Sequence, residues 1–86
     1  MASVNSTIRE YLLAEAMQGA PPEELTDDTN LVEEEILDSL GIFALVEFLE
    51  ETFGIKIEAE EVVMTNFQTV TTIEALVTRL APDRAT

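Results

Sequence analysis

The stretch that decides the fold is Asp38-Ser39-Leu40-Gly41-Ile42-Phe43-Ala44-Leu45-Val46-Glu47-Phe48-Leu49-Glu50-Glu51-Thr52-Phe53-Gly54. Its apolar residues recur mostly three or four positions apart, the spacing that places them on one face of a helix. This face is broad enough to pack against several neighbours. It consists of Ile42, Val46, Leu49 and Phe53, broadened by Phe43 and Leu45. The sequence predicts a helix over residues 39–53, with Gly54 just after its end.

The segment before this helix divides into a second helical pattern and a long loop. Apolar residues between Val4 and Met17 follow the helical period, and we expect Asn5 or Ser6 to be the N-cap. Glycine and proline at residues 19–22 end that pattern. Residues 23–38 show little periodicity, and loops of this length in small domains are usually functional. The apolar residues expected to pin this loop to the core are Leu25, Leu31, Val32, Ile36 and Leu37.

Two helical patterns follow the central one. Residues 58–65 predict a short helix, which needs packing to be stable, and residues 71–80 predict a last helix with Thr71 or Thr72 as its cap. The predicted fold is therefore all-α, a small four-helix bundle with three long helices, one short helix and a long loop between helices one and two. The aromatic residues expected in its core are Phe43, Phe53 and Phe67.

Composition limits the possible functions. Eighty-six residues suffice for one small domain but are too few to enclose a substrate from water. The 18 acidic and 4 basic residues give a formal charge of -14, which argues against nucleic acid and anionic membranes, because both need clustered Lys and Arg. The 47% apolar content argues against disorder. No apolar run approaches the ~20 residues that span a bilayer, so we expect a cytoplasmic protein. We also expect it to be a monomer.

Ser39 is the candidate for chemistry, and it has two interpretations. Serine is favoured at helix N-caps, although the capping box is incomplete because Ile42 stands where Glu or Gln is needed. A catalytic serine would need a base, and the chain has neither histidine nor cysteine. We therefore expect no catalytic residue, and any chemistry at Ser39 must be supplied by another enzyme.

The motif around Ser39 resembles the attachment region of acyl carrier proteins. The resemblance rests on Leu37-Asp38-Ser39-Leu40, on the helix ending in Glu50-Glu51-Thr52-Phe53-Gly54-Ile55-Lys56-Ile57, and on two flanking stretches. The flanking stretches are Leu25-Thr26-Asp27-Asp28 with Asn30-Leu31, and Asn66-Phe67-Gln68-Thr69-Val70-Thr71-Thr72-Ile73-Glu74-Ala75-Leu76-Val77. Together they cover about residues 25–80. We expect residues 1–86 to form a single acyl-carrier domain, ordered over about 4–81.

This resemblance implies a stand-alone carrier and not an enzyme. In that family the serine, here Ser39, receives 4′-phosphopantetheine from coenzyme A through a phosphodiester, and the arm's thiol holds acyl groups as thioesters. A phosphopantetheinyl transferase makes the attachment, and the flanking Asp38 and Leu40 belong to the motif that it reads. Asp38 also suits a helix start, where its charge meets the helix dipole.

The resemblance further implies a partner-binding face on the central helix. Its expected members are Leu40, Gly41, Ala44, Glu47, Glu50 and Glu51. The partners would be an acyltransferase or adenylating ligase, and a ketosynthase or other acyl-using enzyme with a basic docking patch. Many fatty-acid carriers have acidic residues where Gly41 and Ala44 stand, which favours a carrier of the polyketide or nonribosomal-peptide type. We expect Phe43 and Phe48 to crowd the interior and leave little room for cargo.

Three alternatives to a carrier of acyl groups follow from the same sequence. An aminoacyl carrier, similar to D-alanyl carrier proteins, fits the same residues, because the loading enzyme chooses the cargo. An acidic interaction or inhibitor module fits the charge but gives Ser39 no role. A metal site is disfavoured, because the alternation Asp28, Asn30 and Val32 lacks the third ligand and the glycine of a calcium-binding loop.

Overall fold

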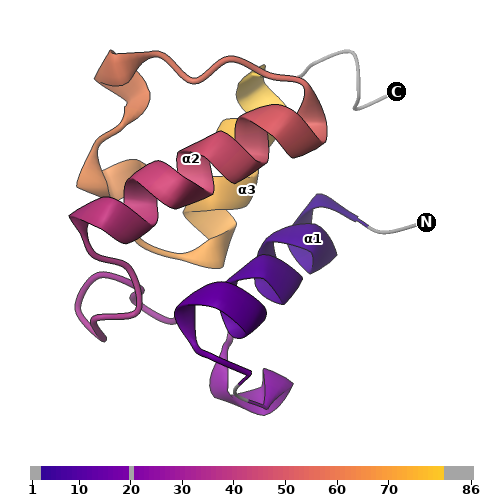
Figure 1. Cartoon of the computed structure of the whole chain (residues 1–86), viewed down its shortest axis with the longest axis vertical. Coiled ribbons are helices and arrows are strands. Elements are labelled where there is room, and N and C mark those ends of the chain that lie inside the picture. Colours follow the sequence, from indigo (N-terminus) through magenta and orange to yellow (C-terminus); the bar gives the residue numbers. More distant parts are fainter. Residues whose placement is uncertain (1–2, 20, 81–86) are drawn as a thin grey trace.

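The computed structural model describes residues 3–19 and 21–80 (Figure 1). It contains three α-helices, α1 (Val4–Tyr11), α2 (Ser39–Phe53) and α3 (Val70–Leu80). The shorter helical turns are a π-helical turn at Leu12–Ala16 and 3-10 turns at Pro22–Glu24, Ala59–Glu61 and Met64–Asn66. No strand occurs in the described ranges, so the all-α prediction is confirmed there. In the part of the chain that the structure describes, none of the helices is long and apolar enough to cross a membrane.

The first helical segment has nearly the predicted extent but a different cap. Ser3 is the N-cap, since its hydroxyl oxygen accepts the backbone N–H of Ser6 at 3.0 Å. The predicted caps, Asn5 and Ser6, lie inside the first turn instead. The last turn is π-helical, with the Met17 N–H donating to the Leu12 carbonyl at 2.8 Å. The chain then leaves the helix through two left-handed residues at 18 and 19.

The bounds of α2 are those that the sequence predicts, whereas its cap is Asp38 and not Ser39. The Asp38 carboxylate accepts the Gly41 N–H at 2.7 Å, which satisfies one of the free donors of the first turn. Gly54 ends the helix in the left-handed conformation (φ 64°), and its N–H donates to the Glu50 carbonyl at 3.0 Å. The backbone reverses direction there.

The core lies where the three helices meet. Its fully or largely buried side chains are Ile8, Leu12, Leu25, Leu31, Leu37, Leu45, Leu49, Phe53, Ile57, Phe67, Val70, Ile73, Leu76 and Val77. Of the five residues predicted to pin the long loop, three are in this set, while Val32 and Ile36 are half-buried. In α3 the apolar residues at helical spacing, Ile73, Leu76 and Val77, are buried, and Leu80 is half-buried.

The prediction that Phe43 belongs to the core is wrong, because its side chain is 62% exposed. Leu45, two residues later, is fully buried. At 3.6 residues per turn, a step of two residues rotates the side chain by roughly 200°, so the two point to nearly opposite sides of α2. Phe48 is half-buried and stacks on Tyr11, with ring centroids 4.3 Å apart, and so covers the core from outside.

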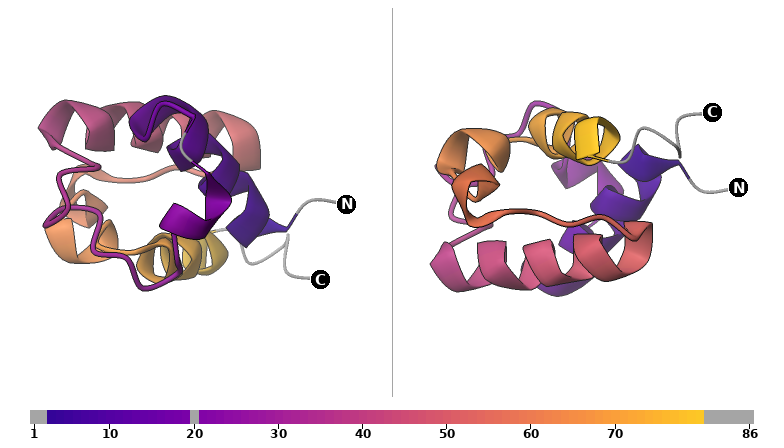
Figure 2. Two further views of the ribbon diagram at one scale, coloured as in Figure 1. Left: turned by 90° about the horizontal axis from the view of Figure 1, so that it is seen from below. Right: turned by 90° about the horizontal axis from the view of Figure 1, so that it is seen from above.

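The connection between α2 and α3 differs most from the prediction. Residues 58–65 do not form an α-helix but contain the two 3-10 turns, so the four-helix bundle is not confirmed. No residue of this segment is fully or largely buried; Ile57 and Phe67, which are, flank it, and a helix needs a continuous apolar stripe to be stabilised by packing. In Figure 2 this connection runs back alongside α2, from the end at Gly54 towards the end at Ser39.

The cap of α3 is also shifted from the predicted position. The Thr69 hydroxyl accepts the Thr72 N–H at 3.1 Å, while the Thr72 hydroxyl accepts the Thr69 N–H at 3.0 Å. This reciprocal pair makes Thr69 the N-cap, with Thr72 completing a box of the kind usually built with Glu or Gln. Thr71 instead donates to the Asp27 carbonyl in the long loop. The predicted tail at residues 83–86 lies outside the described residues.

Candidate functional site

Ser39 occupies the first turn of α2 with its side chain exposed. Because Asp38 takes the capping position, the Ser39 hydroxyl is not needed to satisfy the helix. Among the described residues it takes part in no hydrogen bond with another side chain or with the backbone, in contrast to Ser3 and Ser6, whose hydroxyls pair at 3.0 Å. The hydroxyl of Ser39 is therefore held on a rigid helix and left free.

A small cleft opens beside Ser39, between α2 and the connection that follows it. Its volume is about 160 Å³, and its lining residues are Ser39, Ile42, Phe43, Val62, Val63 and Met64. Apart from the serine, every lining side chain is apolar. The expectation that phenylalanines crowd an interior pocket is therefore wrong for Phe43, which lines a surface cleft. The sequence pattern at 62–64 looked helical, so its contribution to this cleft was missed.

Around the cleft, apolar side chains are unusually exposed. Phe43, Val63 and Met64 line the cleft and are 62%, 46% and 58% exposed, and Leu40, next to Ser39 in the sequence, is 80% exposed. Single exposed apolar residues are common in proteins, but a group of three in one small cleft is typical of an interaction site.

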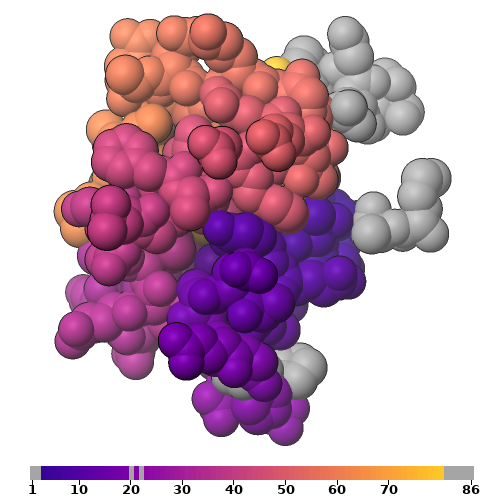
Figure 3. All heavy atoms as spheres, viewed as in Figure 1, coloured from indigo at the N-terminus to yellow at the C-terminus, as the bar shows by residue number. Residues whose placement is uncertain are grey.

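Of the predicted partner-binding residues, the structure brings four together on the exposed side of α2. These are Leu40, Ala44, Glu47 and Glu51, at steps of four, three and four. On the face shown in Figure 3, α2 is visible between α1 and the connection to α3. Glu50 differs, because it is half-buried and its carboxylate accepts the Ile57 N–H at 2.8 Å.

Gly41 is half-buried, and its place under the cap is tight. A Cβ atom at this position would lie 3.2 Å from Asp38 Oδ1 and 3.4 Å from Leu37 Cδ2. Glycine therefore lets the Asp38 carboxylate close onto the first turn without displacement. This offsets in part the cost of a glycine inside a helix, about 0.8–1 kcal/mol relative to alanine.

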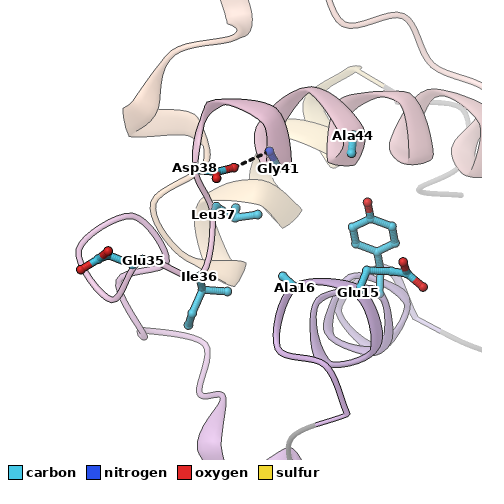
Figure 4. Close-up of a pocket in the computed structure, with 9 residues that line it drawn as sticks. Glu15, Ala16, Glu35, Ile36, Leu37, Asp38, Gly41 and Ala44 are labelled. Carbon is cyan, nitrogen blue, oxygen red and sulfur yellow. Dashed lines mark hydrogen bonds between the residues drawn. The ribbon is translucent and has the colours of Figure 1, made fainter.

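A second cleft, of about 380 Å³, lies between the end of the first helical segment and the start of α2 (Figure 4). Its polar lining consists of Tyr11, Glu15, Glu35 and Asp38, and its floor on α2 is made by Gly41 and Ala44. Burial raises the pKa of Tyr11 above its ordinary value, and the negative charges of Glu15 and Glu47 raise it further. Within residues 3–19 and 21–80, no three acidic side chains converge closely enough to hold a metal ion.

Comparison with known proteins decides the family. Residues 6–80 match the family model described as the phosphopantetheine attachment site. The chain belongs to the acyl carrier protein family. A similar relative is the probable acyl carrier protein PigG of Serratia sp. (strain ATCC 39006), 43% identical over 56 residues. That match covers 65% of this chain and 64% of PigG, so slightly less than two thirds of the relative is represented.

Membership of this family confirms three predictions from the sequence. The protein is an acyl carrier and not an enzyme, and its cofactor is phosphopantetheine. Acyl carrier proteins in general interact with a phosphopantetheinyl transferase and with enzymes that handle acyl groups.

Proposed function

We propose that this acyl carrier protein bears 4′-phosphopantetheine on Ser39 and delivers the attached intermediates to biosynthetic enzymes. The observation that carries the proposal is the free, exposed hydroxyl of Ser39 on the first turn of α2, within a chain that matches the attachment-site model. When bound, the arm supplies a thiol that carries acyl groups as thioesters. The protein itself holds the serine, leaves it accessible and presents the surrounding surface.

The residues around Ser39 fit such an attachment. The start of a helix carries partial positive charge and free N–H groups, which favour the negative charge of a phosphodiester. Asp38 engages the Gly41 N–H and leaves the hydroxyl of Ser39 without a competing partner in the described structure. The adjacent cleft offers an apolar surface beside the attachment point.

We further propose that the exposed row on α2 is the docking face. Leu40 offers an apolar contact beside Ser39, and Glu47 and Glu51 offer negative charge to a basic patch. Such charge complementarity speeds encounter and gives weak, salt-sensitive binding, which suits a carrier that must leave each enzyme after delivery. The proposed partners are the phosphopantetheinyl transferase, an acyltransferase or adenylating ligase, and a ketosynthase or another acyl-using enzyme.

For the pathway, we propose polyketide or related secondary-metabolite assembly in the cytoplasm. Gly41 and Ala44 keep the front of α2 uncharged, which suits dedicated partners better than the acidic front typical of many fatty-acid carriers. An aminoacyl carrier remains the alternative within the family. Trapping the thioester after co-expression with candidate loading enzymes, followed by mass spectrometry, distinguishes an acyl cargo from an aminoacyl cargo.

The attachment is tested on the intact chain. Incubation with a broad-specificity phosphopantetheinyl transferase and coenzyme A should add one arm, as measured by intact-protein mass spectrometry. Ser39→Ala should abolish the addition, whereas Ser6→Ala, which removes another exposed hydroxyl, should leave it unchanged. An unmodified wild-type chain, under conditions that modify a control carrier, would overturn the proposal.

A further inference from the structure

The connection from α2 to α3 forms one wall of the cleft beside Ser39. We call residues 55–67 the strap. After the reversal at Gly54, the strap runs back alongside α2 (Figure 2), and its 3-10 turns bring Val62, Val63 and Met64 to the end of α2 that carries Ser39. The opposite wall is part of α2 itself. The width of the cleft therefore depends on where the strap lies.

Apolar packing holds the strap mainly near its ends. Ile57 is 6% exposed and Phe67 is fully buried, and the Ile57 N–H also donates to the Glu50 carboxylate. Between them Val62 is half-buried and packs against the core, whereas Val63 and Met64 are exposed. The two 3-10 turns are too short to be stable alone. Contacts besides this one partial apolar contact therefore contribute to holding the middle of the strap.

An ion pair with α3 holds this middle part. Arg79 donates from both terminal nitrogens to the two carboxylate oxygens of Glu61, at 3.0 and 2.9 Å. This bidentate geometry restricts orientation as well as distance. Asn66 adds a hydrogen bond from Nδ2 to the Glu61 carbonyl at 2.8 Å and to its Oε1 at 3.3 Å, which ties the two turns together. The pair lies next to Val62, the first residue of the cleft wall.

We propose that Glu61 and Arg79 form a latch that positions the strap and sets the width of the cleft beside Ser39. With the latch closed, the wall formed by Val62, Val63 and Met64 stays against α2. With the latch open, only the half-buried Val62 and the Asn66 hydrogen bond to the Glu61 carbonyl hold the strap between its ends, and the cleft widens. The significance of this latch for the arm rests on the proposed attachment at Ser39, whereas its existence does not.

The latch is accessible to solvent. The side chains are 52% exposed for Arg79 and 26% exposed for Glu61. Salt screens exposed ion pairs, so added salt favours the open latch.

The test uses the fact that the chain has no cysteine. Val62→Cys places a single thiol in the cleft wall, and its labelling rate with an uncharged maleimide reports how often the wall is accessible. In this background, Arg79→Gln and Glu61→Gln should each raise the rate about 1.5- to 5-fold, the range expected from loss of an exposed ion pair. Thr78→Gln, an exposed neighbour on α3, should leave it unchanged.

If the two charges acted on the thiol only through electrostatics, the two variants would change the labelling rate in opposite directions. Removing the positive charge of Arg79 raises the thiol pKa and slows labelling, whereas removing the negative charge of Glu61 lowers the thiol pKa and speeds labelling. A rise in both variants supports the latch, and so does a return to the parent rate when the charges are exchanged (Glu61→Arg with Arg79→Glu). Rates that move in opposite directions, or that do not move, overturn it.

A salt series on the Val62→Cys chain gives a second test. Added sodium chloride should raise the labelling rate towards that of Arg79→Gln, and should have little effect once Arg79 is replaced. Equal salt dependence in both chains overturns the latch. All these measurements use the unmodified protein, so failure of arm addition at Ser39 would overturn the proposed function and leave the latch result intact.

Discussion

The two walls of the cleft beside Ser39 are built in different ways. One wall is α2, a regular helix with a carboxylate cap, a left-handed glycine at its end and a buried apolar face. The other is the strap, which has no regular helix and exposes most of its apolar side chains between two buried ends. A rigid wall thus carries the serine, and the wall that faces it is held by one half-buried valine and a few polar contacts. Rigid placement of the attachment point is compatible with an adjustable surface beside it.

Truncating one side chain on each wall should give the largest contrast. Leu49→Ala removes a fully buried side chain of α2 and should lower the free energy of unfolding by about 2–5 kcal/mol. Met64→Ala removes an exposed side chain of the strap and should change it by less than about 0.5 kcal/mol. Urea unfolding followed by circular dichroism measures both. Equal losses would show that the strap wall is part of the core.

The cap of α2 should give the next largest effect. Asp38→Ala leaves the Gly41 N–H without its acceptor and should cost about 0.5–2 kcal/mol in urea unfolding. Asp38→Asn keeps an acceptor oxygen and should recover most of this loss. Ser39→Ala should be close to neutral, because Ser39 does not cap the helix. A loss at Ser39→Ala as large as at Asp38→Ala would contradict this assignment.

The same contrast explains how much of the structure the sequence could predict. The extent of α2 and the buried face of α3 follow from periodicity, since each element satisfies its own pattern. Caps were misplaced by one to three residues, because several polar residues stand near each helix start and only the backbone geometry selects one. The helix predicted at residues 58–65 is absent, because the adjacent Val62 and Val63 line a surface cleft and only Val62 is also packed against the core.

The candidate site also has a part that could be predicted from the sequence and a part that could not. The motif at Asp38-Ser39-Leu40 and the family could be predicted, because they rest on residues adjacent in sequence. The separation of Glu50 from Glu47 and Glu51 could not, because it depends on a contact with the Ile57 N–H seven residues away. The ion pair between Glu61 and Arg79 joins residues 18 positions apart and leaves no local signal.

The hydrogen bond from the Ile57 N–H to the Glu50 carboxylate connects the two walls, and a substitution at Glu50 tests it. Glu50→Ala removes the acceptor of the Ile57 N–H and should lower the free energy of unfolding by about 0.5–1.5 kcal/mol, while exposing the strap to hydrogen exchange. Glu51→Ala, its exposed neighbour, should leave both unchanged. Strap exchange that is insensitive to Glu50→Ala would show that Ile57 packing alone holds this end.

In a transfer assay with a loading enzyme, Glu47→Lys or Glu51→Lys should slow the reaction while circular dichroism stays unchanged.

The smallest expected effect is on the pKa of Tyr11, which lies on α1 near the carboxylates of Glu15 and Glu47. The chain contains one tyrosine and no tryptophan, so ultraviolet absorbance follows its ionisation directly. Its pKa should lie above the ordinary value, mainly through burial and then through the two carboxylates. A raised pKa means that the folded state holds this proton more tightly, so the contribution of Tyr11 to stability falls as the pH rises from the ordinary pKa to the raised one.

Glu47→Gln should move the pKa part of the way back, whereas Glu51→Gln, with the same charge one turn further on, should move it less. Equal shifts would mean that the net charge of the protein, and not the place of Glu47 beside α1, sets the ionisation of this tyrosine.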